Sequence, residues 1–264
     1  MKTKEIINYL EKRFPIDNAE DFDKPRIGLI AGSSDIELTN ILMSLDLSKD
    51  VALDAVNKNC NLIIVHHPFF FEPMHKVLFD SLYGQVIEIL FKNHISVFAM
   101  HTNLDVGVGG VNDVLAELLE IKNYKIANDS PSKSNYLRYG NIEEMSLEKL
   151  AYYVKDKLNI PGVRILGDLN KKINVIGIIG GSGAHKEDIE NAKKFGCDCL
   201  ITGEVKLNNA QYASFLGLSI LEVNHGIEKN VFYSLRKEMI NDLNLKCNVI
   251  VTDVNTDPLQ YIIK

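Results

Sequence analysis

Short apolar runs separated by amphipathic stretches constrain the fold of this sequence more than any other feature. The run from Asn61 to Val65 is rich in β-branched residues, too short for a helix and too apolar for a strand with one face in water. Such a run is typical of a strand in a sheet covered on both faces. The same analysis predicts strands at 27–31, 41–45, 61–65, 95–100, 173–179, 199–202 and 219–223, and helices at 4–14, 50–58, 83–93, 111–120, 146–158, 187–195 and 207–216. This alternation predicts an α/β architecture.

The chain is long enough for two domains of ordinary size, since it has 264 residues. The polar stretch 123–135, with Asp129-Ser130-Pro131-Ser132, is the best candidate for a boundary. A weak internal repeat supports two units, because Cys60–Val65 resembles Cys197–Thr202. We therefore predict two similar α/β lobes, 1–127 and 128–264, facing each other across a cleft. The final segment could also pack back on the first lobe.

Charge and cysteine content narrow the classes of function. The chain has 29 basic and 35 acidic residues, for a net charge of −6, which disfavours binding to nucleic acid. Its apolar runs are far shorter than the ~20 residues that span a bilayer, and the N-terminus lacks a signal-peptide pattern. Four cysteines without a C-x-x-C motif favour reduced thiols. We expect a cytoplasmic protein with no membrane partner.

Three predicted strands are followed by residues that can bind a metal ion: His66-His67-Pro68, the stretch from His101 to Asp105, and the stretch from His225 to Glu228. Ligands of open α/β sheets bind just beyond the carboxyl ends of strands. Adjacent histidines point apart, which suits two ions, and the other two spacings place both side chains on one face of a helical turn. Imidazoles with carboxylates favour a dinuclear Zn, Mn or Fe centre over Mg or Ca.

The alternative is that these histidines are ordinary polar residues at strand ends, which is the usual role of a single one. Four of the seven histidines fall in these three loops, and this clustering favours a metal site. The remaining three, His75, His94 and His185, lack a partner at metal spacing and are expected at the surface or in a supporting role. We expect Phe69-Phe70-Phe71 to pack in the core. Gly180-Gly181-Ser182-Gly183 is either an anion cradle or a tight turn with positive φ, and both interpretations stay open.

These motifs resemble the Nif-three-like proteins, often described as GTP cyclohydrolase 1 type 2 homologues. The resemblance rests on His66-His67-Pro68, on His101-Thr102-Asn103-Leu104-Asp105, and on the pair His225 and Glu228. It extends over nearly the whole chain through Ala19-Glu20-Asp21-Phe22-Asp23, Leu45-Asp46, Gly110-Val111-Asn112-Asp113, Tyr139-Gly140-Asn141-Ile142 and Ile201-Thr202-Gly203-Glu204. It implies two lobes with a dinuclear centre in the cleft between them and a ring-shaped homohexamer. The chain is a short form without the insertion that some members carry.

The resemblance also implies roles for individual residues. One ion would be bound by His67, Asp105 and Glu228, and the other by His66, His225 and Glu228. Glu228 would then be the bridging, catalytic carboxylate that holds the metal-bound water. His101 and Glu204 are candidates for supporting the ligands or touching substrate. The chain departs from many relatives at Asn224, where they have glycine, and at Lys206-Leu207-Asn208-Asn209, where they have a histidine-containing stretch.

The function that the resemblance implies is metal-dependent hydrolysis of a nucleotide-like or phosphorylated small molecule. For GTP, a metal-activated water would attack C8 and open the imidazole ring. The alternative is a non-catalytic metal-binding, metal-handling or regulatory protein. A DNA-associated ring fits poorly with the acidic charge balance.

Overall fold

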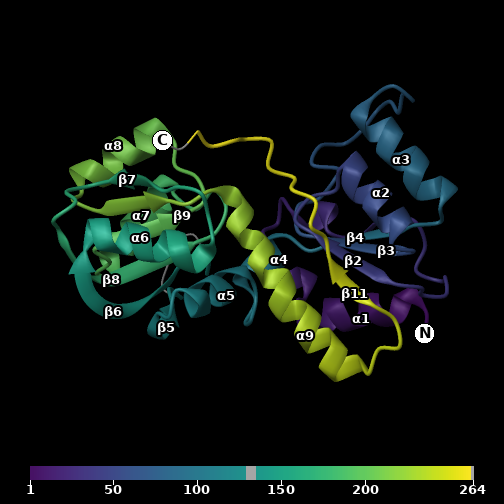
Figure 1. Cartoon of the computed structure of the whole chain (residues 1–264), viewed down its shortest axis with the longest axis horizontal. Coiled ribbons are helices and arrows are strands. Elements are labelled where there is room, and N and C mark those ends of the chain that lie inside the picture. Colours follow the sequence, from purple (N-terminus) through teal and green to yellow (C-terminus); the bar gives the residue numbers. More distant parts are fainter. Residues whose placement is uncertain (129–134, 263–264) are drawn as a thin grey trace. The chain divides into compact units, whose positions relative to one another are not determined.

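The computed structural model describes residues 1–128 and 135–262 and divides into two compact units. The first contains Met1–Gly107 with Phe232–Pro258, and the second contains Val108–Val231 with Leu259–Lys264. Each unit has its own sheet and its own helices (Figure 1). The predicted α/β class with two lobes is therefore confirmed.

The division between the units falls at Gly107, earlier than the boundary expected after residue 127. Helix α5 (Val111–Leu118) and strand β5 (Lys122–Ile126) belong to the second unit, because β5 pairs with β6 (Arg138–Ser146) and α5 contacts the same strand. The polar stretch that suggested the boundary thus begins inside a strand, and its residues 129–134 lie outside the described ranges. Residues Phe232–Pro258 return to the first unit.

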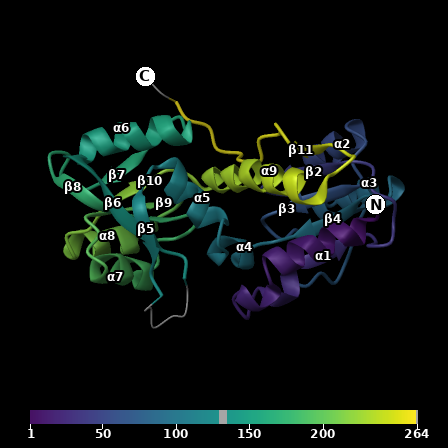
Figure 2. The ribbon, with the colours of Figure 1, turned by 90° about the horizontal axis from the view of Figure 1, so that it is seen from below.

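The sheet of the first unit has the strand order β1-β4-β3-β2-β11. Its strands are β1 (Gly28–Ala31), β2 (Ile41–Ser44), β3 (Leu62–Val65), β4 (Ser96–Ala99) and β11 (Val249–Val251). All pairs are parallel except β1 with β4. Helices α2 (Lys49–Asn57) and α3 (Leu82–Lys92) cover one face, and α1 (Thr3–Arg13) lies on the other beside α9 (Val231–Leu243) (Figures 1 and 2). Every residue of β2, β3 and β4 is consequently buried, as the apolar runs predicted.

The sheet of the second unit has the order β5-β6-β8-β9-β10-β7. Here β8 (Lys172–Ile179), β9 (Cys199–Thr202) and β10 (Ser219–Glu222) are parallel, whereas β7 (Arg164–Leu166), β6 and β5 join antiparallel. Helices α7 (Lys186–Lys194) and α8 (Leu207–Phe215) pack on one face, and α5 and α6 (Leu147–Leu158) lie on the other (Figure 2).

Within the described ranges, four strands and two α-helices were not predicted. Strand β5 lies at the start of the stretch interpreted as a polar boundary, and β6 has no regular alternation and was assigned to no element. Strands β7 and β11 have only three residues each, and helix α4 (Thr102–Val106) has five. Helix α9 carries a buried stripe that was available in the sequence, formed by Val231, Phe232, Leu235 and Met239. The other predicted strands and helices are present with small shifts at their ends.

The weak sequence repeat reflects a repeated topology. The series β1-β2-α2-β3-α3-β4 in the first unit has the same order and strand directions as β7-β8-α7-β9-α8-β10 in the second. Pairing aligns Leu62 with Ser96 in one copy and Cys199 with Ser219 in the other. A glycine with positive φ follows the first strand of each copy, and a Cβ there would lie 2.5 Å (Gly32) or 2.7 Å (Gly167) from the hydroxyl of that serine. The two copies therefore share close packing as well as strand order.

The helices are short, and several begin at polar residues that satisfy their first amide groups. Ser48, Ser81 and Ser146 accept hydrogen bonds from the amides at the starts of α2, α3 and α6. At the start of α7 the amide of His185 donates to Asp188 instead. Among the described ranges, no helix is both long enough and apolar enough to cross a membrane.

Candidate metal centre

Three histidines gather at one edge of the first unit's sheet. His66 and His67 follow β3, and His101 follows β4. Since β3 and β4 are parallel neighbours, their carboxyl ends lie together. The ring centroids of these histidines are 4.9 to 5.7 Å apart, and one nitrogen from each lies within 4.8 Å of the others. Imidazole nitrogens at this spacing could bind a metal ion.

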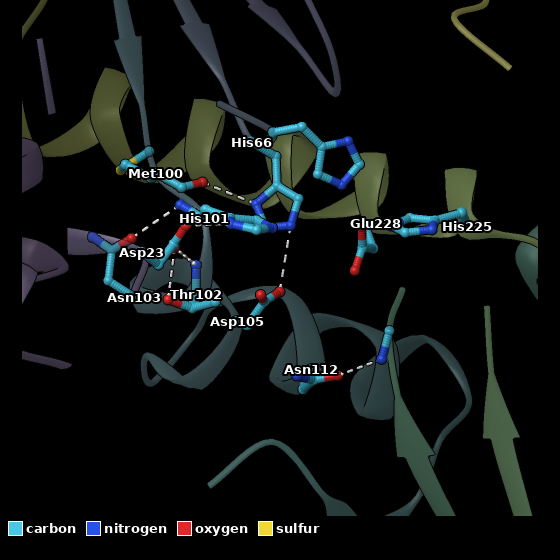
Figure 3. A network of polar contacts seen from close by, with 12 residues as sticks. Asp23, His66, Met100, His101, Thr102, Asn103, Asp105, Asn112, His225 and Glu228 are labelled. Atoms are coloured by element: carbon cyan, nitrogen blue, oxygen red, sulfur yellow. Dashed lines mark hydrogen bonds and ion pairs between the residues drawn. The ribbon is translucent and has the colours of Figure 1, made fainter. Parts of the chain in front are cut away.

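A buried carboxylate faces this cluster. The short helix α4 (Thr102–Val106) begins after His101, and its amides at Leu104 and Asp105 donate to the His101 carbonyl. The turn places Oδ1 of Asp105 3.4 Å from Nε2 of the fully buried His66 (Figure 3). The resemblance assigns Asp105 to the same ion as His67, whereas this contact joins it to His66.

Each histidine of the cluster is anchored through Nδ1. His66 donates to the Met100 carbonyl over 2.9 Å, His67 contacts Asp46 Oδ1 at 2.6 Å, and His101 contacts Asp23 Oδ1 at 2.9 Å. Since carbonyl and carboxylate oxygens accept, Nδ1 of each ring carries a proton, and in the neutral ring Nε2 is then the nitrogen with the lone pair. An acceptor of this kind behind a histidine is typical of metal ligands, because it fixes both the tautomer and the ring orientation.

Asp23 is the acceptor that holds the His101 loop. It is fully buried, and its Oδ2 accepts from both the amide (3.1 Å) and the hydroxyl (2.8 Å) of Thr102. Burial acts to raise the pKa of Asp23, but the hydrogen bonds from His101 and Thr102 outweigh burial and lower it. The ionised carboxylate therefore orients His101. The sequence indicated Asp23 and Asp46 only as parts of the family motifs, without this role.

The second unit repeats the scheme with other residues. His225 and Glu228 lie on the 3₁₀ helix η3 (His225–Asn230), with Nε2 of the histidine 3.2 Å from Oε2 of the buried glutamate. Nδ1 of His225 contacts Glu204 Oε1 at 2.8 Å. Glu204 therefore supports a candidate ligand, which is one of the roles expected for it.

The glycine turn after β8 makes room for Glu228. Gly181 has a φ of +57°, and a Cβ there would lie 2.5 Å from Glu228 Oε1 and 3.1 Å from His225 Nε2. Two amides of the turn already donate inside the protein, from Gly180 to Asn112 (Figure 3) and from Gly183 to Thr202. With a carboxylate over the turn and these amides engaged, the tight-turn interpretation is favoured over an anion cradle.

The three histidines outside the candidate site lie at the surface, and the aromatic run 69–71 is only partly buried. His75, His94 and His185 are exposed. Phe69 packs on the core and against Tyr83, as expected. Phe71 is 47% exposed and stacks under the guanidinium of Arg26, so the run is only partly core.

Together these contacts describe imidazoles with anchored Nδ1 atoms beside buried carboxylates, in each unit taken by itself. This donor set fits Zn, Mn or Fe, which accept imidazole nitrogen together with carboxylate oxygen. An all-oxygen ion such as Mg or Ca fits it less well.

Comparison with known proteins places this fold and these motifs in one family. The sequence matches Duf34/NIF3 (NGG1p interacting factor 3) over residues 1–258. It is 31% identical to the GTP cyclohydrolase 1 type 2 homolog of Clostridium acetobutylicum, with 99% of each chain covered. Among solved structures, a Bacillus cereus protein related to NIF3 superposes with a TM-score of 0.92 at 24% identity, and hypothetical protein SA1388 of Staphylococcus aureus with 0.91 at 32%, each covering 99% of both chains.

The chain belongs to the Duf34/NIF3 family. Within it, the chain is similar to proteins named GTP cyclohydrolase 1 type 2 homolog. The predicted family is therefore confirmed.

Proposed function

We propose that this protein is a dinuclear-metal-dependent hydrolase of a nucleotide-like or phosphorylated small molecule. The observation that carries the proposal is the anchoring of Nδ1 in four histidines, which fixes the orientation of four imidazoles that lie beside buried carboxylates or beside one another. In this proposal His66, His67, Asp105, His225 and Glu228 would hold two ions of Zn, Mn or Fe, and Glu228 would be the carboxylate shared by both, as the resemblance implies.

When bound, two such cations supply a water nucleophile that ionises near pH ~7 and polarise the bond that is attacked. The chain's own residues would do the rest. Asp46, Met100, Asp23 and Glu204 hold the imidazoles in one tautomer, so the ligands are oriented before any ion arrives. His101, anchored by Asp23, is available to touch substrate or support Asp105. The name shared by the relatives supports a nucleotide-like substrate.

Metal content and turnover test the proposal together. Protein purified without chelator should contain about two transition-metal ions per chain. Substitution of His67 or Asp105 should empty one position, and Glu228→Gln should weaken both while leaving the fold intact. Against a panel of nucleotides and phosphoesters, wild type should turn over at least one substrate with a rate that rises with pH, and Glu228→Gln should lose that activity.

The outcomes separate two functions. Absence of stoichiometric metal after several mild preparations would overturn the metal centre itself. Stoichiometric metal with no turnover, or with equal turnover in Glu228→Gln, would reject the hydrolase and leave a non-catalytic metal-binding, metal-handling or regulatory protein.

We further propose that the protein assembles as a homohexamer, as its resemblance implies, and that it is cytoplasmic, as its cysteine content favours. A run of exposed apolar side chains before and at the start of α3 supports self-association: Val77 (54% exposed), Leu78 (57%), Phe79 (83%) and Leu82 (62%). Light scattering at micromolar concentration should report six chains, and a monomer near 30 kDa would contradict the assembly.

A further inference from the structure

The segment that follows β11 leaves the sheet at the edge where the three histidines lie. Strand β11 is parallel to β2, with Val251 opposite Met43, and the amide of Thr252 continues the ladder to the Met43 carbonyl. After Met43, strand β2 ends at Ser44, and Leu45 and Asp46 follow it. The residues that follow β11 therefore reach Asp46, the carboxylate that anchors His67.

This segment is held in place by its own contacts. The buried Thr252 donates its hydroxyl to Asp54 over 2.6 Å and accepts from the amide of Val254. Val254 packs against the core, and Asn255 and Asp257 close a turn through reciprocal hydrogen bonds. The position of Thr256 is thus fixed from both sides.

Thr256 completes a chain of hydrogen bonds that ends at a candidate metal ligand. Its hydroxyl donates to Asp46 Oδ2 over 2.5 Å, while Asp46 Oδ1 contacts His67 Nδ1 at 2.6 Å. An ionised carboxylate only accepts, so both neighbours must donate, and His67 must carry its proton on Nδ1. Oδ2 of Asp46 thus accepts from Thr256, and Oδ1 accepts from His67.

We propose that Thr256 is a positioning residue for the metal centre, acting on His67 through Asp46. The Asp46 side chain is 38% exposed, and the torsion that turns its carboxylate is soft. The threonine hydroxyl holds one oxygen and thereby keeps the other directed at Nδ1 of His67. The consequence for metal affinity rests on the metal centre proposed above, whereas the effect on the tautomer of His67 does not.

Zinc affinity of the full chain, measured by competition with a chromophoric chelator, tests the consequence. Asp46→Asn should weaken binding by about 10-fold or more, and Thr256→Val by a smaller factor of about threefold. Thr256→Ser, which keeps the hydroxyl, should bind zinc with wild-type affinity. In the Asp46→Asn background, Thr256→Val should have no further effect, because the two residues act in series. If both proteins bind zinc, equal affinity of wild type and Thr256→Val would overturn the proposal.

Nitrogen NMR of histidines in the metal-free protein provides a second readout, with His67 assigned by His67→Gln. Wild type and Thr256→Ser should show the Nδ1–H tautomer of His67, and Thr256→Val should show a mixture with the Nε2–H form. An unchanged His67 signal in Thr256→Val would reject the positioning role whatever the protein binds. The Nδ1–H tautomer in wild type, its loss in Thr256→Val, and no zinc binding in any variant would reject the metal centre and retain the role of Thr256.

Discussion

The two copies of the repeated topology differ in what they carry at the carboxyl ends of their strands. In the first unit β3 is followed by His66 and His67, and in the second the equivalent strand β9 is followed by Gly203 and Glu204. After β2 comes Asp46, whereas Gly181 stands at the equivalent place after β8. The order of strands and helices is thus repeated, whereas most of the residues that follow the carboxyl ends of the strands differ between the copies.

One acidic position is common to both copies. Asp105 lies as many residues beyond Ser96 as Glu228 lies beyond Ser219, and each is on a short helix that follows the strand. The position of His67 has changed its role: its equivalent, Glu204, holds the imidazole of His225. A position that offers a candidate ligand in one copy supports a candidate ligand in the other, so residue type at these strand ends cannot be inferred from topology.

The largest effect is expected where the copies are most alike. Gly32→Ala and Gly167→Ala should each lower the free energy of unfolding by about 3 kcal/mol, because the new Cβ meets a serine hydroxyl and positive φ strains an alanine. Urea unfolding of the metal-free protein measures both. If only one variant is destabilised, the copies do not share this packing.

The second largest effect is expected on metal affinity, at Glu204, the position where the first copy has His67. Glu204→Ala should weaken metal binding by about 10-fold, because His225 loses its Nδ1 acceptor. Glu204→Gln should cost much less, since an amide oxygen can still accept that proton. Chelator competition gives both values, with the exposed Glu143→Ala as control. If Glu204→Gln weakens metal binding as much as Glu204→Ala, the negative charge of Glu204 itself contributes to metal affinity. The position would then resemble that of His67, which is a proposed ligand.

The smallest effect distinguishes the helices that follow β2 and β8. At the start of α2 the side chain of Ser48 accepts a backbone amide, whereas at the start of α7 the carboxylate of Asp188 does so. Burial raises the pKa of Asp188 to about 6. Because this pKa is higher in the folded than in the unfolded state, protonation favours folding. Wild type should therefore gain stability relative to Asp188→Asn as the pH falls from 7.5 towards 5. Urea unfolding across that range measures the difference, and a constant difference would show that Asp188 does not titrate there.

The sequence was sufficient to predict the architecture and to find candidate ligands, because both depend on local patterns. Fully apolar runs such as Leu62–Val65 identify central strands, and polar residues at strand ends identify the site edge. The supporting contacts could not be predicted in this way. Asp46 and Thr256 are 210 residues apart, and Asp23 and His101 are 78 apart, so only the folded chain brings them together. Strand β11 is likewise recognisable only beside β2.

The return of Phe232–Pro258 to the first unit has a consequence for synthesis on the ribosome. The second sheet is built from one continuous stretch, from Lys122 to Glu222, and can close as soon as that stretch emerges. The first sheet must wait with β2 as an unpaired edge until β11, which is translated after every strand of the second sheet, emerges. A nascent chain stalled before residue 249 would expose that edge to other chains, and His67 would still lack the contact that orders its anchor.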